Sequence, residues 1–327
     1  MKIITSIKDQ IDYCNSLTKE KKNISLIPTM GNLHKGHESL LAKSSLIKNE
    51  KIVSLFVNPL QFNNIDDYKG YPESIDSDIK ILERNKIDCL FMPSENEMLK
   101  DINESESIDL PEYTRILCGK YRDGHFLGVF KIVKKLFEII RPSVAYFGKK
   151  DYQQLTMIKH LSEKYFNNQI SIISCDTIRE NNGLAMSSRN SRLTLPEKNI
   201  ASFVHKELIS LKKSIRIDGN YNYKELQKES IDSLTALGIK VEYLELLSLG
   251  NKSAGLIVSC LAQPDGNCGW LVLTPVTFAG AALPAKLFSP AWKFDPQGPL
   301  PAKLAGEPFM FLRPSVTYLT DFSLEYL

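Results

Sequence analysis

The chain has 327 residues, of which 43% are hydrophobic and 24% charged, and 41 Lys and Arg against 38 Asp and Glu give a net charge of +3. This composition is that of a folded globular chain and excludes a disordered or collagen-like one. So small a net charge supplies no field for wrapping nucleic acid, so we expect no nucleic-acid partner. A local basic site for a phosphorylated small molecule remains compatible with it.

Strand-like and helix-like patterns alternate over the first half of the chain. The apolar runs and helical periodicities predict these elements in chain order: strand 24–27, helix 37–48, strand 51–57, helix 74–86, strand 88–92, helix 129–140, strand 144–147, helix 152–165 and strand 170–175. This alternation predicts an α/β fold with a doubly wound parallel sheet. Ligands of such sheets bind at the carboxyl ends of the strands.

The pattern changes after Cys175. A polar loop over 179–192 precedes two amphipathic helices at 196–214 and 223–237 and a strand at 239–246, which together predict a smaller α+β domain. Near Gly250 the composition changes again, since nine of the 16 prolines and both tryptophans lie beyond it. We therefore predict three parts: 1–175, 176–249, and an atypical tail over 250–327 that is rich in Pro, Ala and Gly.

Two segments of the sequence could be mistaken for targeting or membrane segments, and we predict neither. The N-terminal residues become polar too early for a signal peptide. The longest uncharged run, 266–285, contains Pro275 and Pro284 and little Leu or Ile, so we predict no spanning helix and no membrane partner. Six cysteines are scattered without a C-x-x-C pair, which predicts free thiols and a cytoplasmic location: Cys14, Cys89, Cys118, Cys175, Cys260 and Cys268.

The motif PTMGNLHKGH at 28–37 joins a predicted strand to a predicted helix. Free backbone N–H groups and the dipole at a helix N-terminus favour phosphate. His34 and His37 flank Gly36 there and can donate to phosphate oxygens whose charge grows during transfer. Two surface histidines at a turn are the plainer alternative, which the repeated imidazole beside glycine disfavours.

Three further strand or loop ends carry polar side chains. Asn58 and Gln61 follow the strand over 51–57 and can hold hydroxyl or carboxylate groups, although Asn-Pro also occurs simply as turn chemistry. Lys150 can neutralise phosphate, and Asp151 can bind Mg²⁺ or merely cap the next helix. Ser187, Ser188 and Arg189 form a candidate phosphate clamp. Three glycines at 119, 124 and 128 predict close approach at a helix start.

These segments, PTMGNLHKGH, VSLFVNPLQF, CGKYRDGHFLGV, YFGKKDYQQL and GLAMSSRN, resemble in order and spacing the pantoate–β-alanine ligase (pantothenate synthetase) family. The resemblance runs to about Leu249. It implies a Rossmann-like fold of the His-x-Gly-His nucleotidyltransferase group with a C-terminal lid, in a homodimer. It also implies that pantoate and Mg-ATP form a pantoyl adenylate and pyrophosphate, after which β-alanine displaces AMP to give pantothenate.

The resemblance assigns roles residue by residue. It implies that His34, His37, Lys150, Ser187, Ser188 and Arg189 carry catalysis. It implies ATP contacts from those residues and from Met30, Gly31, Gly148, Asp151, Ile178 and Met186, and pantoate contacts from Met30, Asn58, Gln61 and Gln154. It places Asp151 toward Mg²⁺, as the expected metal ligand, or toward ribose. His125 is placed at the mouth of the site without a defined role.

The sequence also departs from the family pattern. Lys149 stands where the family usually has Glu, which predicts extra positive charge beside the ATP site. The usual family ending is absent, although Gly255–Cys260 could form a lid strand. Two alternatives therefore stay open: a related nucleotidyltransferase that acts on a phosphorylated alcohol, and an ATP-binding protein that an incomplete lid has inactivated.

Overall fold

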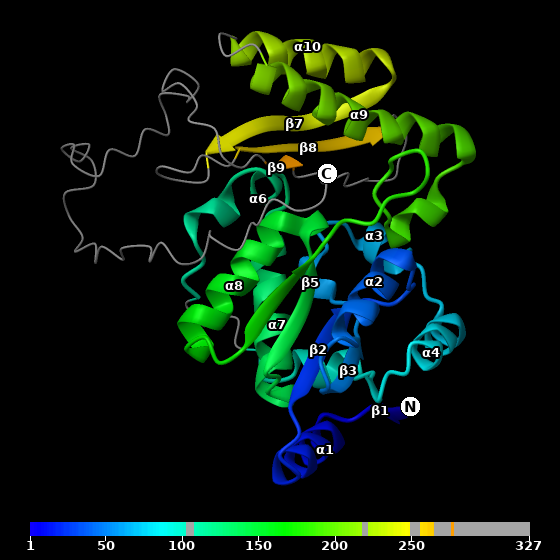
Figure 1. Cartoon of the computed structure of the whole chain (residues 1–327), viewed down its shortest axis with the longest axis vertical. Coiled ribbons are helices and arrows are strands. Elements are labelled where there is room, and N and C mark those ends of the chain that lie inside the picture. The colour runs from blue at the N-terminus through cyan, green and yellow to red at the C-terminus, as the bar shows by residue number, and fades with distance from the viewer. Residues whose placement is uncertain (103–107, 218–221, 249–255, 265–275, 278–327) are drawn as a thin grey trace, which may run out of the picture.

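A parallel six-stranded sheet forms the centre of the molecule (Figure 1). The computed structural model describes residues 1–102, 108–217, 222–248, 256–264 and 276–277. The sheet has the order β1-β4-β3-β2-β5-β6, with the strands β1 (Lys2–Ile4), β2 (Ile24–Thr29), β3 (Glu50–Leu55), β4 (Cys89–Phe91), β5 (Val144–Gly148) and β6 (Ser171–Cys175). From β2 the chain continues to β3 and β4 on one side, whereas β5 and β6 lie on the other. The carboxyl ends of β2 and β5 therefore flank a topological switch point.

Helices cover both faces of this sheet. They are α1 (Ile7–Lys19), α2 (Lys35–Ser44), α3 (Ile65–Lys69), α4 (Ile75–Arg84), α5 (Glu95–Leu99), α6 (Cys118–Tyr121), α7 (His125–Ile140) and α8 (Tyr152–Phe166). Short 3₁₀ turns lie between them: η1 (Pro59–Gln61), η2 (Glu112–Arg115), η3 (Lys149–Asp151) and η4 (Ser188–Arg192).

Successive residues of β2 belong to different hydrophobic clusters. Leu26 packs in the cluster that contains buried residues of α1, α7 and α8, whereas Ile27 packs in the cluster with Leu41 of α2 and Leu82 of α4. A strand sends alternate side chains to opposite faces, so apolar residues at both positions indicate a strand covered on both sides. The predicted doubly wound α/β fold is confirmed.

A second sheet lies above the carboxyl ends of the first (Figure 1). It consists of β7 (Ile239–Ser248), β8 (Leu256–Pro264) and β9 (Val276–Thr277), all antiparallel, and α9 (Leu195–Ile217) and α10 (Tyr223–Ala236) pack against it. Strand β8 covers most of the Gly255–Cys260 run that the sequence offered as a lid strand. The domain boundaries at 175 and 249 stay predictions, and residues 278–327 of the predicted tail lie outside the described part.

The structure adds elements that periodicity did not predict, namely β1, α1, α3, α5, α6 and β9. Strand β1 has three residues, and the buried side of α1 includes the polar Gln10 beside Cys14 and Leu17, so neither gives a clear apolar pattern. Predicted element ends shift by a few residues: the helix expected over 37–48 spans Lys35–Ser44, and the helix expected from Val129 begins at His125. Such boundaries depend on capping contacts more than on periodicity.

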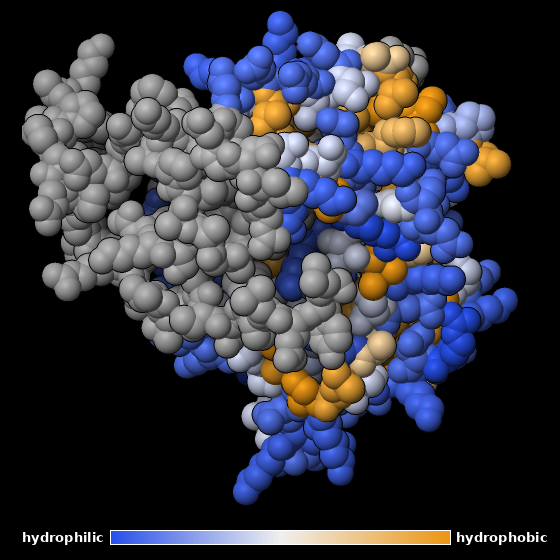
Figure 2. All heavy atoms as spheres, turned by 45° about the horizontal axis from the view of Figure 1, so that its top comes forward, coloured by the Kyte–Doolittle hydropathy of each residue, from blue (hydrophilic) through white to orange (hydrophobic). Residues whose placement is uncertain are grey.

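Four cysteines are buried free thiols: Cys14, Cys89, Cys118 and Cys175. The side chains of Cys260 and Cys268 lie outside the described part. Within the described residues, no helix is long and apolar enough to cross a membrane, while the run at 266–285 lies almost wholly outside them. On the face that Figure 2 shows, the described residues are mostly hydrophilic, and their hydrophobic members form small separate patches.

Candidate active site

A cavity of about 600 Å³ lies at the switch point, between the parallel sheet and the second sheet. It collects segments that are far apart in the sequence: the ends of β2 and β5, the starts of α2 and α7, the turn η1 and the loop before α9. Every site residue expected from the sequence lines it except Gly31: Met30, His34, His37, Asn58, Gln61, Gly148, Lys150, Asp151, Gln154, Ile178, Met186, Ser187, Ser188 and Arg189.

The two histidines of the His-x-Gly-His motif form the N-terminal cap of α2. The backbone N–H of Gly36 donates to Nδ1 of His34 at 3.1 Å, and the N–H of His34 donates to Nδ1 of His37 at 3.3 Å. Their ring centroids lie 4.1 Å apart. A Cβ on Gly36 would lie 2.7 Å from the His34 ring, so glycine is required for this ring position.

These contacts fix which ring nitrogens can face a ligand. Because Nδ1 of each histidine accepts a backbone N–H, the ring proton of the neutral form resides on Nε2. Burial, followed by the charge of Lys150, lowers the pKa of His34 to about 4. Burial, together with the charges of His34 and Lys150, also lowers the pKa of His37 well below its ordinary value. Both imidazoles are therefore neutral N–H donors at physiological pH.

Asp78 of α4 holds the loop that precedes these histidines, a role that sequence reasoning missed. Its buried carboxylate accepts the backbone N–H of Asn32 at 2.8 Å and of Leu33 at 2.7 Å. Gly31 has a φ of +82° and sits against this carboxylate, which explains why it supports the loop without lining the cavity. These hydrogen bonds join residues 45 or 46 positions apart in the sequence. Local periodicity therefore gives no sign of them.

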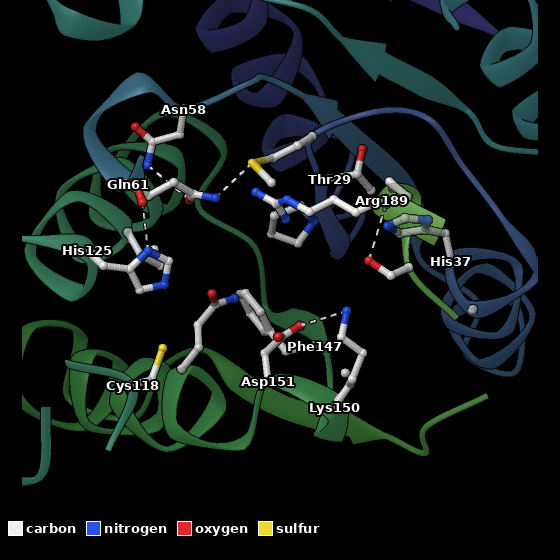
Figure 3. A pocket seen from close by; sticks show the side chains of 18 of the residues that line it. Thr29, His37, Asn58, Gln61, Cys118, His125, Phe147, Lys150, Asp151 and Arg189 are labelled. Atoms are coloured by element: carbon white, nitrogen blue, oxygen red, sulfur yellow. Dashed lines mark hydrogen bonds and ion pairs between the residues drawn. The ribbon is translucent and has the colours of Figure 1, made fainter. Parts of the chain in front are cut away.

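Asn58 and Gln61 lie together on the other side of the cavity (Figure 3), and Met30 contacts Gln61 there. Asn58 donates to the carbonyl of Gly128 at 3.1 Å and to Oε1 of Gln61 at 3.3 Å, and Gln61 donates to the sulfur of Met30 at 2.8 Å. A Cβ on Gly128 would lie 2.2 Å from the carbonyl oxygen of Leu60. The predicted close approach is confirmed at Gly128, where it seats η1 on α7, and at Gly119, where a Cβ would meet the Thr114 carbonyl. It is wrong for Gly124, where a Cβ would meet nothing within 4 Å and where glycine instead allows a φ of +73°.

His125 lies beside this cluster. Its Nδ1 is 2.8 Å from the carbonyl oxygen of Gln61, so Nδ1 carries the proton and Nε2 carries the lone pair. Burial lowers the pKa of His125 to about 4, against the opposing effect of the Gln61 carbonyl. The neutral His125 imidazole can thus accept a hydrogen bond at Nε2, whereas His34 and His37 donate one from Nε2.

Charged side chains follow the end of β5 and reach the cavity. Nζ of Lys150 lies 3.9 Å from Oδ2 of Asp151, and both side chains line the cavity (Figure 3). Asp151 stands at the N-cap position of α8 but makes no side-chain cap hydrogen bond, so capping does not account for it. Lys149 pairs with Asp176 at 2.6 Å. The extra positive charge predicted for Lys149 is therefore matched by a carboxylate.

The loop before α9 closes the cavity. Ser188 donates from Oγ to the carbonyl of Asn32 at 3.0 Å, and the Asn32 amide donates to the carbonyl of Ser188 at 3.2 Å. Oγ of Ser187 accepts the N–H of Arg189 at 3.3 Å. Both hydroxyls thus shape the loop, whereas the Arg189 guanidinium reaches into the space between Gln61 and His37 (Figure 3).

Sequence reasoning also missed Asp67 and Tyr71, which line the cavity near Arg189, and Glu242 of β7. Beside Glu242, the Tyr243 ring stacks on Tyr121 of α6 at 5.6 Å. The second sheet therefore contacts the parallel-sheet part at the cavity itself. Among the described residues no cluster of three or more His, Cys, Asp or Glu could hold a metal ion by itself.

Comparison with known proteins points to one family. The family model described as pantoate-beta-alanine ligase matches residues 2–262, past Leu249 and into β8. The chain is 42% identical over 245 residues to the pantothenate synthetase of Legionella pneumophila strain Lens, covering 75% of this chain and 91% of that protein. It is 39% identical over 246 residues to the pantothenate synthetase of Neisseria meningitidis strain FAM18, covering 75% and 86%.

Solved structures give the same result. The pantoate-beta-alanine ligase of Francisella tularensis, complexed with beta-gamma ATP and beta-alanine, superposes with a TM-score of 0.69 at 36% identity, covering 85% of this chain and 97% of that one. The pantothenate synthetase of Thermus thermophilus superposes with a TM-score of 0.71 at 27% identity, covering 85% and 98%. The cavity, its motifs and these matches together lead to one conclusion: the chain belongs to the pantoate-beta-alanine ligase family.

Proposed function

We propose that this cavity joins pantoate to β-alanine in two ATP-dependent steps and that its two ends serve different substrates. The donors and cations of His34, His37, Lys150 and Arg189 suit the ATP phosphates. The observation that carries this proposal is that both histidines present Nε2–H donors on one cavity wall, because both Nδ1 atoms are occupied by backbone N–H groups.

The amides at the other end suit pantoate. Asn58, Gln61 and Gln154 offer donors and acceptors for its hydroxyls and carboxylate, beside the apolar Met30. A separate group of residues lines the wall toward ATP: Gly148, Ile178 and Met186. We divide the cavity between the two substrates by the kind of side chain at each end. Cations and N–H donors suit phosphate, whereas neutral amides suit a hydroxy acid.

The first step forms one bond and breaks one. A pantoate carboxylate oxygen attacks the α-phosphorus of ATP, and the bond to the bridging oxygen of pyrophosphate breaks. The neutral imidazoles of His34 and His37 donate to phosphate oxygens as negative charge grows on them. Lys150 neutralises charge as a compact cation, and Arg189 can bind two oxygens with its fork of donors. Positioning and charge stabilisation supply the rate.

The second step transfers the pantoyl group. The unprotonated amine of β-alanine attacks the acyl carbon, the amide bond forms, and AMP leaves with the carboxylate oxygen that had joined the phosphorus. The amine loses its proton as the amide forms. The second sheet, through Glu242 and Tyr243 of β7, stands where it can limit the access of water to the adenylate.

Magnesium is part of the proposal. Mg²⁺ binds through one or two carboxylates together with substrate phosphates, so a lone carboxylate at the phosphate end is sufficient protein ligation. Asp151 fits this role because its side chain lines the cavity beside Lys150 and makes no cap bond. When bound with ATP, the ion would offset negative charge on the phosphates.

We also propose a homodimer in the cytoplasm. The dimer rests on the family resemblance, and the location rests on the buried free thiols of Cys14, Cys89, Cys118 and Cys175, which suit a reducing compartment.

Exchange of labelled pyrophosphate into ATP tests the proposal. With Mg²⁺ and without β-alanine, we expect exchange that requires pantoate. Exchange supported by a phosphorylated alcohol instead would establish the nucleotidyltransferase alternative. ATP binding without any exchange would establish an inactive ATP-binding protein. Adding β-alanine to the active mixture should then release AMP and pantothenate in equal amounts.

A further inference from the structure

One carboxylate holds two arginines at the edge of the cavity. Asp67 of α3 accepts from Nη2 of Arg189 at 2.8 Å and from Nε of Arg189 at 3.3 Å. It also accepts from Nη1 of Arg192 at 2.9 Å, and Nη2 of Arg192 donates to the carbonyl of Gly70. The two arginines belong to η4, 122 and 125 residues away in the sequence.

The pairing leaves part of the Arg189 guanidinium available. Its contacts with Asp67 use Nε and Nη2, so Nη1 lies outside this ion pair. The guanidinium carbon lies 5.4 Å from the ring centroid of Tyr71 and 5.7 Å from that of Phe62. Two aromatic rings and a two-point ion pair restrict the guanidinium to one orientation.

The charges agree with this arrangement. Burial would raise the pKa of Asp67, but the hydrogen bonds and charges of Arg189 and Arg192 outweigh it and hold the pKa below its ordinary value. Burial would likewise lower the pKa of Arg189, whereas Asp67 raises it. Without the carboxylate, two guanidinium groups would lie close together without the negative partner that they share.

We propose that Asp67 is a positioning residue for adenylate formation: it holds Arg189 by Nε and Nη2 so that Nη1 is presented to the ATP phosphates. This inference rests on the proposed function. Asp67 follows Asn58 and Gln61 on the same segment, so it also connects the pantoate end of the cavity with the loop that closes over the phosphates.

A role for Asp67 as a competitor of ATP would give the opposite effect on ATP binding. If Asp67 occupied Arg189 in place of phosphate, ATP would have to displace it, and removing the carboxylate would tighten ATP binding. The geometry favours positioning because Arg192 shares the carboxylate and the pairing spares Nη1. A variant that keeps the shape but removes the charge separates the two roles.

Asp67→Asn is that variant, and Asp66→Asn is its matched control. Asp66 is the exposed neighbour in the same first turn of α3, so both changes alter the helix dipole alike. We expect Asp67→Asn to lower kcat for pantoate-dependent pyrophosphate exchange about 10- to 100-fold, with a smaller rise in KM for ATP, as for loss of an oriented donor. Asp66→Asn should change kcat less than about twofold, since exposed charges contribute little.

A double-mutant cycle establishes whether Asp67 acts through Arg189. On an Arg189→Lys background, which cannot form the two-point pairing, we expect Asp67→Asn to change kcat less than about threefold. Equal effects on both backgrounds would overturn the inference, as would an Asp67→Asn enzyme that matches Asp66→Asn or binds ATP more tightly than the unaltered chain. If Asp67→Asn does not fold, Asp67→Glu gives the same cycle with the charge retained and displaced by one methylene.

The unaltered chain separates this test from that of the proposed function. No pantoate-dependent exchange by the unaltered chain defeats the proposed function. Normal exchange by the unaltered chain, with Asp67→Asn equal to Asp66→Asn, defeats only the role of Asp67.

Discussion

The two regions of the cavity that we assign to the ATP phosphates are built in different ways. His34 and His37 are fixed by hydrogen bonds to backbone groups two or three residues away. Arg189 is fixed by Asp67 across 122 residues, and the serine beside it is tied to Asn32 across 156. The first region is a local cap, and the second exists only when distant segments meet.

Because of this difference, the two regions depend on the rest of the fold to different degrees. A local cap forms with its helix, and the Asp78 carboxylate also holds the loop before it. A clamp that depends on distant segments is complete only when the loop before α9 is seated on α3 and on the 28–37 loop. We therefore expect changes in the first region to affect chemistry directly, and changes in the second to act through loop position.

His37→Ala should give the largest effect. It removes a neutral Nε2–H donor from the wall that we assign to phosphate, and we expect pantoate-dependent exchange to fall about 100- to 1000-fold, or about 3–4 kcal/mol in transition-state stabilisation. Steady-state exchange kinetics measure it. His160→Ala in α8, on a histidine that does not line the cavity, is the control and should retain most activity. A His37→Ala enzyme within about threefold of normal would contradict the donor role.

Gly128→Ala tests the long-range contact at the end of the cavity that we assign to pantoate. The new methyl group would meet the Leu60 carbonyl, so we expect the free energy of unfolding to fall by about 1–3 kcal/mol. KM for pantoate should rise because η1 carries Asn58 and Gln61. Gly148→Ala is the stability control, since its Cβ would meet only the Lys150 nitrogen at 3.9 Å. Equal stability of the two variants would show that the backbones do not need this approach.

The buried histidines predict the pH dependence of stability. The pKa values of His34 and His125 fall from 6.5 to about 4 on folding, so between these pH values the unfolded chain binds protons that the folded chain excludes. The free energy of unfolding should therefore decrease as pH falls from about 6.5 toward about 4, by at most about 1.4 kcal/mol per pH unit for each histidine.

Urea unfolding at about pH 7 and about pH 5 measures this slope. His125→Gln should make it shallower because one excluded proton is lost. An unchanged slope in that variant would mean that His125 titrates alike in the folded and unfolded chains.

Asn32→Ala should give the smallest effect, because it weakens the bridge between the two regions without removing a phosphate contact. It deletes the amide bond to Ser188 and places alanine at a φ of +48°, which we expect to destabilise the fold by about 1–2 kcal/mol. Asn32→Gly relieves the backbone strain and still lacks the amide. A loss of exchange of about threefold or less in both variants is the expected result, and a loss as large as that of His37→Ala would show that the bridge is essential.

Local signals in the sequence were sufficient for much of the fold and site. Apolar runs identified β2 to β6, and the motifs at their carboxyl ends identified the cavity wall from His34 to Arg189. The close approach of Gly128 was also visible, because glycine marks positions where a side chain does not fit.

Contacts between distant segments gave no such signal. Asp78 and Asp67 look like ordinary acidic residues at the starts of α4 and α3, yet one holds the loop before His34 and the other holds Arg189. The predicted uses of the two serines were also incomplete, because hydrogen bonds to Asn32 and Arg189 engage them in the loop. Their partners depend on the topology of the folded chain, which periodicity does not encode.

Isotope transfer from pantoate to AMP tests the central claim most directly. With ¹⁸O in the pantoate carboxylate, the two-step reaction predicts that one labelled oxygen appears in the phosphate of AMP, because that oxygen attacks the α-phosphorus and leaves with it. AMP without label, formed while pantothenate accumulates, would contradict an adenylate formed between the imidazole donors and the amide end of this cavity.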